Sequence, residues 1–111
     1  MTLRLLYSPF PDRAQAKDVA HTLLQERHVA CVNVLPGVSS YYYWEGTLQE
    51  ETEVILLAKT SYAQAHIAVQ RLEALHPYEC PCVLVLPTTQ GNDAFTQWVQ
   101  QMTGPQDAIN V

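Results

Sequence analysis

The sequence predicts a domain of the α+β class. Short stretches of alternating or continuous apolar residues indicate strands, and segments with apolar residues at helical spacing separate them in the order β-α-β-β-α-β. An additional amphipathic segment near the C-terminus predicts a third helix. Because 111 residues suffice for one hydrophobic core, we expect a single domain over residues 1–111, with 106–111 as a polar tail.

The first half of the chain supplies two strands and a helix. Residues 3–7 form the first strand, which Ser8-Pro9-Phe10-Pro11 is expected to end. Asp12 can cap the following helix, whose apolar stripe comprises Ala16, Val19, Ala20, Leu23 and Leu24. The second strand covers 29–35, and a β-rich stretch resumes over 38–44 after a kink at Pro36-Gly37.

The second half repeats the alternation. Glu45-Gly46 makes a turn into a strand over 47–60, whose centre, 54–58, is apolar on both faces. Ser61 and Gln64 form a capping box for the second helix, and a fourth strand covers 83–86. Asn92 can cap the third helix, with the stripe Phe95, Trp98, Val99 and Met102. Two right-handed crossovers interleaved in this way predict a ferredoxin-like split β-α-β sheet with helices on one face.

Composition excludes several functions. Net charge is −5 and the six basic residues are scattered, so no basic stripe could follow a nucleic-acid backbone. No apolar run approaches the roughly 20 residues of a membrane helix. Three cysteines make an odd number and no disulfide framework, which favours a reducing, cytoplasmic location. Only 15% of residues are charged, which favours a surface covered by further copies of the chain.

The central hairpin is the most informative feature. Its two strands, 29–44 and 47–60, are longer than the other strands can cover, and its tip carries Tyr41, Tyr42, Tyr43 and Trp44. A monomer would leave this apolar edge exposed. We therefore expect these aromatics to form an intersubunit interface, with packing on their own domain as the alternative.

Five segments in order resemble the CutA family of divalent-cation tolerance proteins: Ala30–Val38, Tyr43–Gly46, Glu53–Thr60, His76–Glu79 and Gly91-Asn92. The resemblance covers nearly the whole chain. It implies a ferredoxin-like subunit related in plan to PII-like signalling proteins, a homotrimer, and a role in divalent-metal tolerance, copper in particular. Within these segments, the residues expected at a ligand-binding or intersubunit cleft are Cys31, Asn33, Trp44, Glu45, Lys59, His76, Tyr78 and Glu79.

Cys80 and Cys82 are the candidate metal ligands, with His76 close by in sequence. Thiolates and imidazole suit Cu(I) or Zn, provided that both cysteines share a face of the fourth strand. One-residue spacing is a weak signal, however, and both cysteines depart from the family pattern. The alternative is two small residues packed beside Pro81. Cys31 matches the family pattern, yet a single strand cysteine is more often a core residue than a ligand.

His76-Pro77-Tyr78-Glu79 offers an imidazole, a phenol and a carboxylate in one turn after the second helix. These groups could bind a cation or small ligand in a cleft between subunits, or could hold a subunit contact through hydrogen bonds. Lys59 could pair with one of these acids, or extend its ammonium group to water.

The sequence carries no enzyme signature: it has no nucleophile elbow, no glycine-rich loop after a strand and no HExxH. We therefore expect a cytoplasmic, CutA-like trimer that binds metal or a small ligand and is not an enzyme. The alternatives are a structural trimer with incidental metal binding and a PII-like trimer that senses a small ligand.

Overall fold

Three helices and a four-stranded sheet follow one another in the predicted order in the structure, a computed structural model that describes residues 2–105. The polar tail expected at 106–111 lies outside the described residues. The elements are β1 (Leu3–Phe10), α1 (Arg13–Gln25), β2 (Cys31–Trp44), β3 (Thr47–Ser61), α2 (Tyr62–Leu75), β4 (Leu84–Pro87) and α3 (Asp93–Met102).

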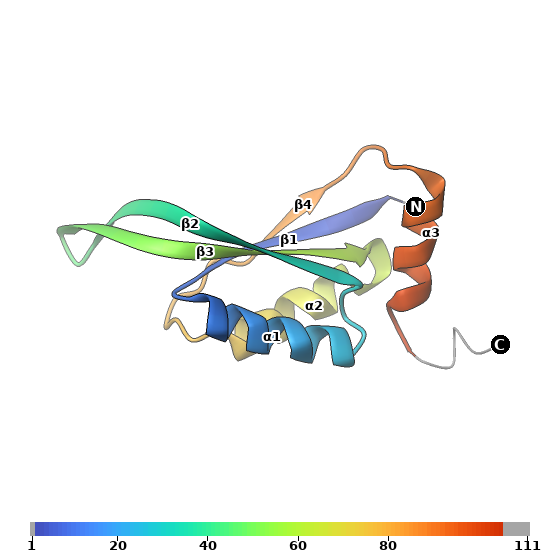
Figure 1. Ribbon diagram of the computed structural model, residues 1–111, viewed down its shortest axis with the longest axis horizontal. Coiled ribbons are helices and arrows are strands. Elements are labelled where there is room, and N and C mark those ends of the chain that lie inside the picture. The colour runs from blue at the N-terminus through green and yellow to red at the C-terminus, as the bar shows by residue number, and fades with distance from the viewer. Residues whose placement is uncertain (1, 106–111) are drawn as a thin grey trace.

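The sheet has the order β2-β3-β1-β4, and every neighbouring pair is antiparallel. The connections β1-α1-β2 and β3-α2-β4 are the two interleaved crossovers, so the predicted ferredoxin-like arrangement is confirmed. In Figure 1, α1 and α2 lie side by side below the sheet, and α3 stands at the end where the N-terminus lies. The helices α1 and α2 thus cover one face of the sheet and leave its other face uncovered by either of them.

The core lies between the sheet and these two helices. Alternate residues of β1 and β3 point into it, among them Leu6, Phe10 and Leu56, which are fully buried. Leu23 from α1 and Leu72 from α2 meet them there and are also fully buried. Apolar residues repeat every two positions in the strands and about every 3.6 positions in the helices, so the apolar face of each element points into the same core.

β1 is longer than the sequence predicted, because it continues through Pro9 to Phe10. Pro9 pairs in register with Ile55 of β3, while its carbonyl accepts a hydrogen bond from the ring of His76. The backbone groups of Pro9 therefore point away from β3, on a side where β4 no longer reaches. A proline is tolerated there because the missing N–H would have had no ladder partner.

The kink predicted at Pro36-Gly37 is a β-bulge inside one continuous strand. Leu35 pairs with Ile55 and Val38 with Glu53, so two residues of β2 oppose one residue of β3. Gly37 has φ 71°, a left-handed conformation that favours glycine.

The fourth strand begins later than predicted, at Leu84. Cys80 and Cys82 precede the strand, so the condition that both lie on one face of it, which the metal hypothesis required, is not met. The segment 79–83 has no strand pairing, since β1 pairs with β4 only from Tyr7 back to Arg4.

The two predicted caps of α1 and α2 are confirmed. The Asp12 carboxylate accepts the Gln15 N–H at 2.8 Å, and the Ser61 hydroxyl accepts the Gln64 N–H at 3.3 Å. Asn92 occupies the N-cap position of α3 but makes no side-chain capping bond.

The predicted buried stripe of α3 is only partly correct. Val99 is fully buried, whereas the other three members, Phe95, Trp98 and Met102, are exposed. The far end of α3 is held by Arg27, whose guanidinium donates to the carbonyls of Gln101 and Gly104. Since α3 packs with little of its own surface, this helix presents an apolar face outward.

Candidate functional site

The hairpin projects beyond the rest of the domain, as Figure 1 shows, and we call its outer part, residues 38–53, the arm. The long dimension of the molecule is 53 Å, against 26 and 21 Å for the others. The four tip aromatics, Tyr41 to Trp44, are 39–73% exposed. In a single chain, therefore, these aromatics do not pack on their own domain, which was the alternative.

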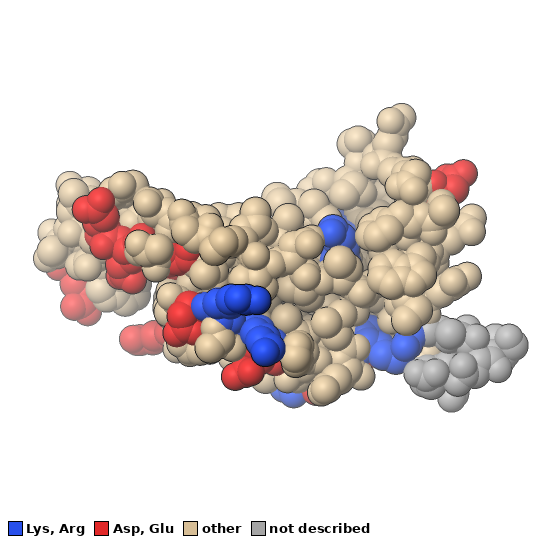
Figure 2. All heavy atoms as spheres, viewed as in Figure 1, with Lys and Arg blue, Asp and Glu red and all other residues tan. Residues whose placement is uncertain are grey.

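The arm carries negative charge only. Glu45, Glu50, Glu51 and Glu53 lie on it, and residues 38–53 contain no lysine or arginine. Figure 2 shows this face of the arm with acidic atoms and no basic ones, while the basic atoms gather over the rest of the domain. The negative potential of the arm therefore has no local compensation.

A pocket of about 490 Å³ lies at the base of the arm, and we call it the arm pocket. It is bounded by the arm, by the end of β1 and by the segment that connects α2 to β4. Its lining residues are Pro9, Tyr42, Trp44, Gln49, Glu51, Glu53, Tyr78, Glu79, Cys80 and Cys82. Three carboxylates, two phenols, two thiols and an indole thus meet at one concave surface.

Strand register explains why the arm residues of this pocket share a face. Tyr42 pairs with Gln49 and Trp44 with Thr47, while Glu51 and Glu53 follow Gln49 at intervals of two along β3. Side chains of directly paired residues and of residues two apart point to the same side of a sheet. One face of the arm therefore supplies both aromatic rings and both acids.

The predicted turn after α2 supplies the opposite wall, and hydrogen bonds fix its shape. The Tyr78 N–H donates to His76 Nδ1 at 3.1 Å, and His76 Nε2 contacts the Pro9 carbonyl at 2.8 Å. Nδ1 is therefore the acceptor and Nε2–H the donor. The ring of His76 is buried against Phe10, with centroids 4.1 Å apart, and burial lowers the pKa of His76. His76 thus supports the pocket as a neutral ring.

Two phenols donate their protons to the acids of the arm. The Tyr78 hydroxyl donates to Glu53 Oε2 at 2.6 Å, and the Tyr42 hydroxyl donates to Glu51 Oε1. Burial, together with the bond to Glu53, strongly raises the pKa of Tyr78, and the bond to Glu51 raises the pKa of Tyr42. Both phenols therefore stay protonated at neutral pH and point those protons at carboxylates.

Glu53 is the most buried acid of the pocket, with only 7% of its surface exposed. Tyr78 is its partner at Oε2, and over residues 2–105 no hydrogen bond reaches Oε1 and no ion pair reaches the carboxylate. Buried carboxylates are ordinarily paired with a cation or fully hydrogen-bonded. Glu53 Oε1 is not among the buried atoms of the described residues that lack a partner, so this oxygen is open to the pocket and can accept a hydrogen bond there.

The predicted metal trio of His76, Cys80 and Cys82 is not assembled. Both nitrogens of His76 are engaged by backbone groups, and among residues 2–105 no three His, Cys, Asp or Glu side chains are placed to hold one ion. Cys80 and Cys82 are exposed free thiols on the pocket wall, beside Glu79. Burial at its sulfur, and then the charge of Glu53, raises the pKa of Cys82.

The predicted cleft residues divide into two groups. Trp44, Tyr78 and Glu79 line the arm pocket, whereas Lys59 lies with Cys31 and Asn33 on the open sheet face. Lys59 Nζ is 2.5 Å from Asn33 Oδ1 and 3.7 Å from Cys31 Sγ, so the suggested pairing with the acids of the turn is wrong.

Glu45, the remaining member of the predicted cleft, is exposed in the turn at the arm tip, with φ 51°. It does not line either pocket described here.

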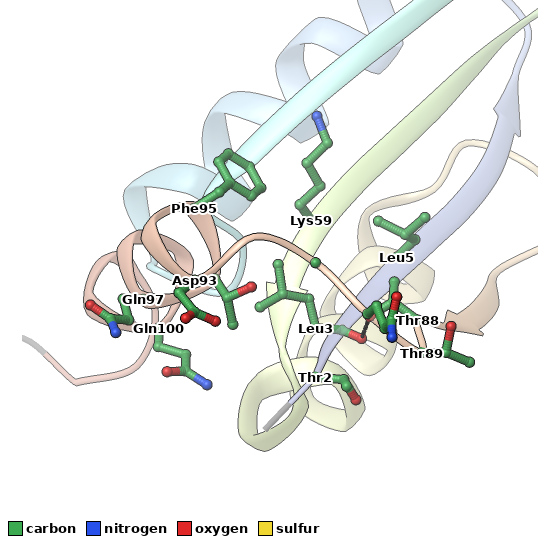
Figure 3. Close-up of a pocket in the computed structure, with 13 residues that line it drawn as sticks. Thr2, Leu3, Leu5, Lys59, Thr88, Thr89, Asp93, Phe95, Gln97 and Gln100 are labelled. Carbon is green, nitrogen blue, oxygen red and sulfur yellow. Dashed lines mark hydrogen bonds between the residues drawn. The ribbon is translucent and has the colours of Figure 1, made fainter.

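Lys59 belongs to a second, larger hollow of about 1000 Å³ between α3, β1 and the segment after β4, which we call the end cavity. Figure 3 shows Lys59 extending beside the Phe95 ring, 5.9 Å from its centroid, with Leu3 and Leu5 along the sheet. Most of its other lining side chains are uncharged threonines and glutamines. The described lining of this cavity also carries one cationic side chain, Lys59, and one acidic side chain, Asp93, unlike that of the arm pocket, whose charged groups are all acidic.

Tyr42, Glu51 and Glu53 are not predicted as binding residues from the sequence. Tyr42 is predicted at the subunit interface alone, and the two acids are placed within a strand. The available signal was the spacing of Gln49, Glu51 and Glu53, which places three polar groups on one face of a strand opposite Tyr42.

The fold and the pocket define an α+β protein of ferredoxin-like plan, with an extended acidic arm and a binding pocket at its base. No helix among residues 2–105 is long and apolar enough to cross a membrane. Residues 4–102 match the family described as CutA1 divalent ion tolerance protein. The chain belongs to this family.

Relatives agree with this assignment. The chain is 42% identical over 89 residues to the divalent-cation tolerance protein CutA of Citrobacter koseri and equally to that of Salmonella newport, which covers 80% of this chain and 77% of each relative.

Solved structures are similar over nearly the whole fold. CutA1 from Ehrlichia chaffeensis has a TM-score of 0.90 at 31% identity, covering 94% of this chain and 97% of the other. CutA from Xylella fastidiosa has a TM-score of 0.90 at 34% identity, covering 94% and 100%.

Proposed function

We propose that this protein binds divalent or soft metal ions, copper in particular, as a homotrimer, and that it acts by binding and not by catalysis. One observation carries the proposal: the arm pocket brings the thiols of Cys80 and Cys82 to the same concave surface as three carboxylates, with no basic residue among its lining. Thiolates suit Cu(I) and Zn²⁺, and carboxylates raise the local concentration of any cation.

The donor types fit a soft cation, although the described side chains do not converge on one point. Cys80 and Cys82 would hold the metal, and Glu79, exposed beside them, would supply the additional oxygen donor. Because the pKa of Cys82 is raised, its thiolate forms less readily at neutral pH. Metal affinity is therefore expected to increase as pH rises from 6 to 8.

The test is metal binding by the double variant Cys80→Ser/Cys82→Ser, measured with Cu(I) under anaerobic reducing conditions and with Zn²⁺. We expect at least a tenfold loss of affinity, with fold and assembly intact. The matched control is Cys31→Ser, since Cys31 lies outside the arm pocket. Unchanged affinity in the double variant, or an equal loss in the control, would contradict the assignment of these ligands.

The homotrimer is supported by the apolar surface that a single chain exposes. Leu84, Val85 and Leu86 of the edge strand are 40–53% exposed, and the arm aromatics are exposed as well. Closed cyclic symmetry removes such edges. Light scattering at micromolar concentration should give three times 12.5 kDa, and a stable species of 12.5 kDa would refute the trimer.

The end cavity favours a second candidate function, a PII-like trimer that senses a small ligand. Its volume of about 1000 Å³ and its polar lining, which includes the cationic Lys59, suit a small polar molecule better than a metal ion. In that case Lys59→Met would abolish ligand binding while leaving metal affinity unchanged, which separates the two functions.

The cytoplasm is the compartment we propose, because the three cysteines are free and two of them are exposed. One solved structure of a similar chain, from Archaeoglobus fulgidus, is described as a periplasmic divalent cation tolerance protein. Fractionation of cells that express the full chain would decide between the two compartments.

A further inference from the structure

We propose that the arm pocket binds an organic cation with N–H donors, a primary ammonium or a guanidinium group, against Glu53 and beneath the rings of Tyr42 and Trp44. This activity goes beyond metal binding, since it uses the buried acid and the aromatic face of the pocket and not the thiols. Three properties of the pocket carry it: its hydrogen-bonding inventory, the Glu53 carboxylate with one oxygen open to the pocket, and its aromatic wall.

The inventory of the pocket is almost entirely made of acceptors. Glu51, Glu53 and Glu79 are carboxylates without protons to donate. Tyr42 and Tyr78 have each given their one hydroxyl proton to a glutamate, so their oxygens face the pocket as acceptors. Among the described lining side chains, the nitrogen donors are the Gln49 amide and the indole N–H of Trp44. A ligand that satisfies such a surface must itself bring several N–H donors.

The charge of Glu53 determines the sign of the ligand. The residue is 7% exposed, and its Oε1 oxygen, which accepts no hydrogen bond from the described residues, is open to the pocket. No lysine, arginine or histidine lines the pocket. A cation that donates to Oε1 would satisfy the carboxylate, and the bond from Tyr78 holds that carboxylate in place.

The aromatic wall and the volume favour an organic cation over a bare metal ion. A metal ion at Glu53 would require several donors at about 2.0–2.6 Å around one point, and among residues 2–105 no group of three His, Cys, Asp or Glu side chains placed to hold an ion includes Glu53. An ammonium group needs only hydrogen-bond distances, and the faces of Trp44 and Tyr42 attract its charge and cover its carbon chain. A volume of about 490 Å³ leaves space for an alkyl or arylalkyl group behind the nitrogen.

The cationic group could arrive on a free small molecule or on a lysine or arginine side chain of a second copy of this chain. Both sources share the same recognition chemistry. The two sources differ in how the loss of the Glu53 charge affects assembly. It weakens assembly only if the cationic group belongs to a second copy of the chain.

The experiment titrates the full-length protein with butylammonium and with butylguanidinium at pH 7, and follows the Trp44 indole resonance. The neutral isostere butan-1-ol serves as the ligand control. We expect saturable shifts with both cations and none with the alcohol. Equal binding of the alcohol would overturn the proposal, because it would show an apolar hollow without charge recognition.

Glu53→Gln keeps the shape of the side chain and removes the charge, so butylammonium affinity should fall at least tenfold. Glu50→Gln is the matched control, since Glu50 pairs with Tyr41 on the other face of the arm and should bind as the parent does. Tyr78→Phe, which removes the donor to Oε2, is the second variant should Glu53→Gln unfold. Unchanged affinity in both pocket variants would overturn the proposal.

Light scattering of the same variants distinguishes the sources. If Glu53→Gln leaves assembly unchanged while butylammonium affinity falls, the group comes on a free molecule. If the added amines do not bind and Glu53→Gln dissociates the assembly where Glu50→Gln does not, the group belongs to a second copy. If neither effect occurs, the pocket takes no organic cation.

Retained Cu(I) binding in Glu53→Gln, and retained amine binding in Cys80→Ser/Cys82→Ser, would separate this site from the proposed metal site.

Discussion

The body of the domain and the arm are built from the same two strands, yet different forces hold them. In the body, β3 is buried from Val54 to Leu56, and α1 and α2 cover that side of the sheet. In the arm, every residue from Tyr41 to Leu48 is exposed, and acids take the place of the apolar residues. The body is thus stabilised by its own core, whereas the arm depends on backbone pairing within one hairpin.

A two-stranded hairpin without a covering layer is marginally stable in water. The contacts that tie the arm down lie at its base, where Tyr78 reaches Glu53. The comparison indicates that residues in the body determine stability, while residues in the arm are free to serve recognition. Each of the following predictions tests that division.

The largest effect is expected from Phe10→Ala in the body. Phe10 is fully buried and stacks on His76, so its removal leaves a cavity and should cost about 3–5 kcal/mol of unfolding free energy. Chemical denaturation measures it. Tyr43→Ala is the control in the arm, 73% exposed, and should change the free energy by less than about 0.5 kcal/mol in the monomer. Similar losses in both variants would show that the division is wrong.

A smaller effect is expected from Gly37→Ala, at the junction of body and arm. Gly37 has φ 71° and open space around the position of a Cβ, so the cost is backbone strain alone, about 1 kcal/mol. If arm and body unfold together, global stability falls by that amount. If the arm opens independently, hydrogen exchange in residues 38–53 accelerates while the global free energy stays the same.

The smallest effect concerns pH and His76, which joins the two regions. Burial lowers its pKa below the ordinary 6.5, so the unfolded chain takes up a proton more readily than the folded one. Its contribution to stability is present above about pH 6.5 and is lost as pH falls toward the lowered value, by at most about 1.4 kcal/mol per pH unit.

Thermal unfolding of His76→Gln between pH 5 and 7.5 should therefore show a weaker loss of stability on acidification than the parent. His66→Gln, at an exposed histidine of α2, is the control and should retain the full dependence. An identical pH dependence in His76→Gln and the parent would refute the role of His76.

The fold was predictable because its signals are local. Asp12 and Ser61 cap helices through bonds to residues three positions ahead, and the apolar periods of α1 and β3 are visible within single segments. The end of β1 was not predictable in the same way. Whether Pro9 stops a strand depends on which side of it has a partner, and that is a property of the whole sheet.

The site was less predictable than the fold because it is formed by residues that lie far apart in the sequence. Tyr78 and Glu53 lie 25 positions apart and meet only because the turn after α2 returns to the base of the arm. The suggested pairing of Lys59 with an acid of the turn is wrong because strand register, which places it beside Cys31, cannot be deduced from its position in the sequence. The metal hypothesis for Cys80 and Cys82 required both to lie on the fourth strand, which begins two residues after Cys82.

The bulge at Pro36-Gly37 changes which residues of β2 face each side of the sheet. Before it, the even-numbered Val32 and Val34 of β2 turn toward the helices; after it, Tyr42 and Trp44, also even-numbered, line the arm pocket on the opposite face. Deleting one residue here would restore regular pairing and leave Val38 opposite Glu53 and Tyr42 opposite Gln49, because the residues on both sides of the bulge already have these partners. The bulge therefore absorbs one extra residue of β2, and the indole stays on the side of Glu53 with or without it.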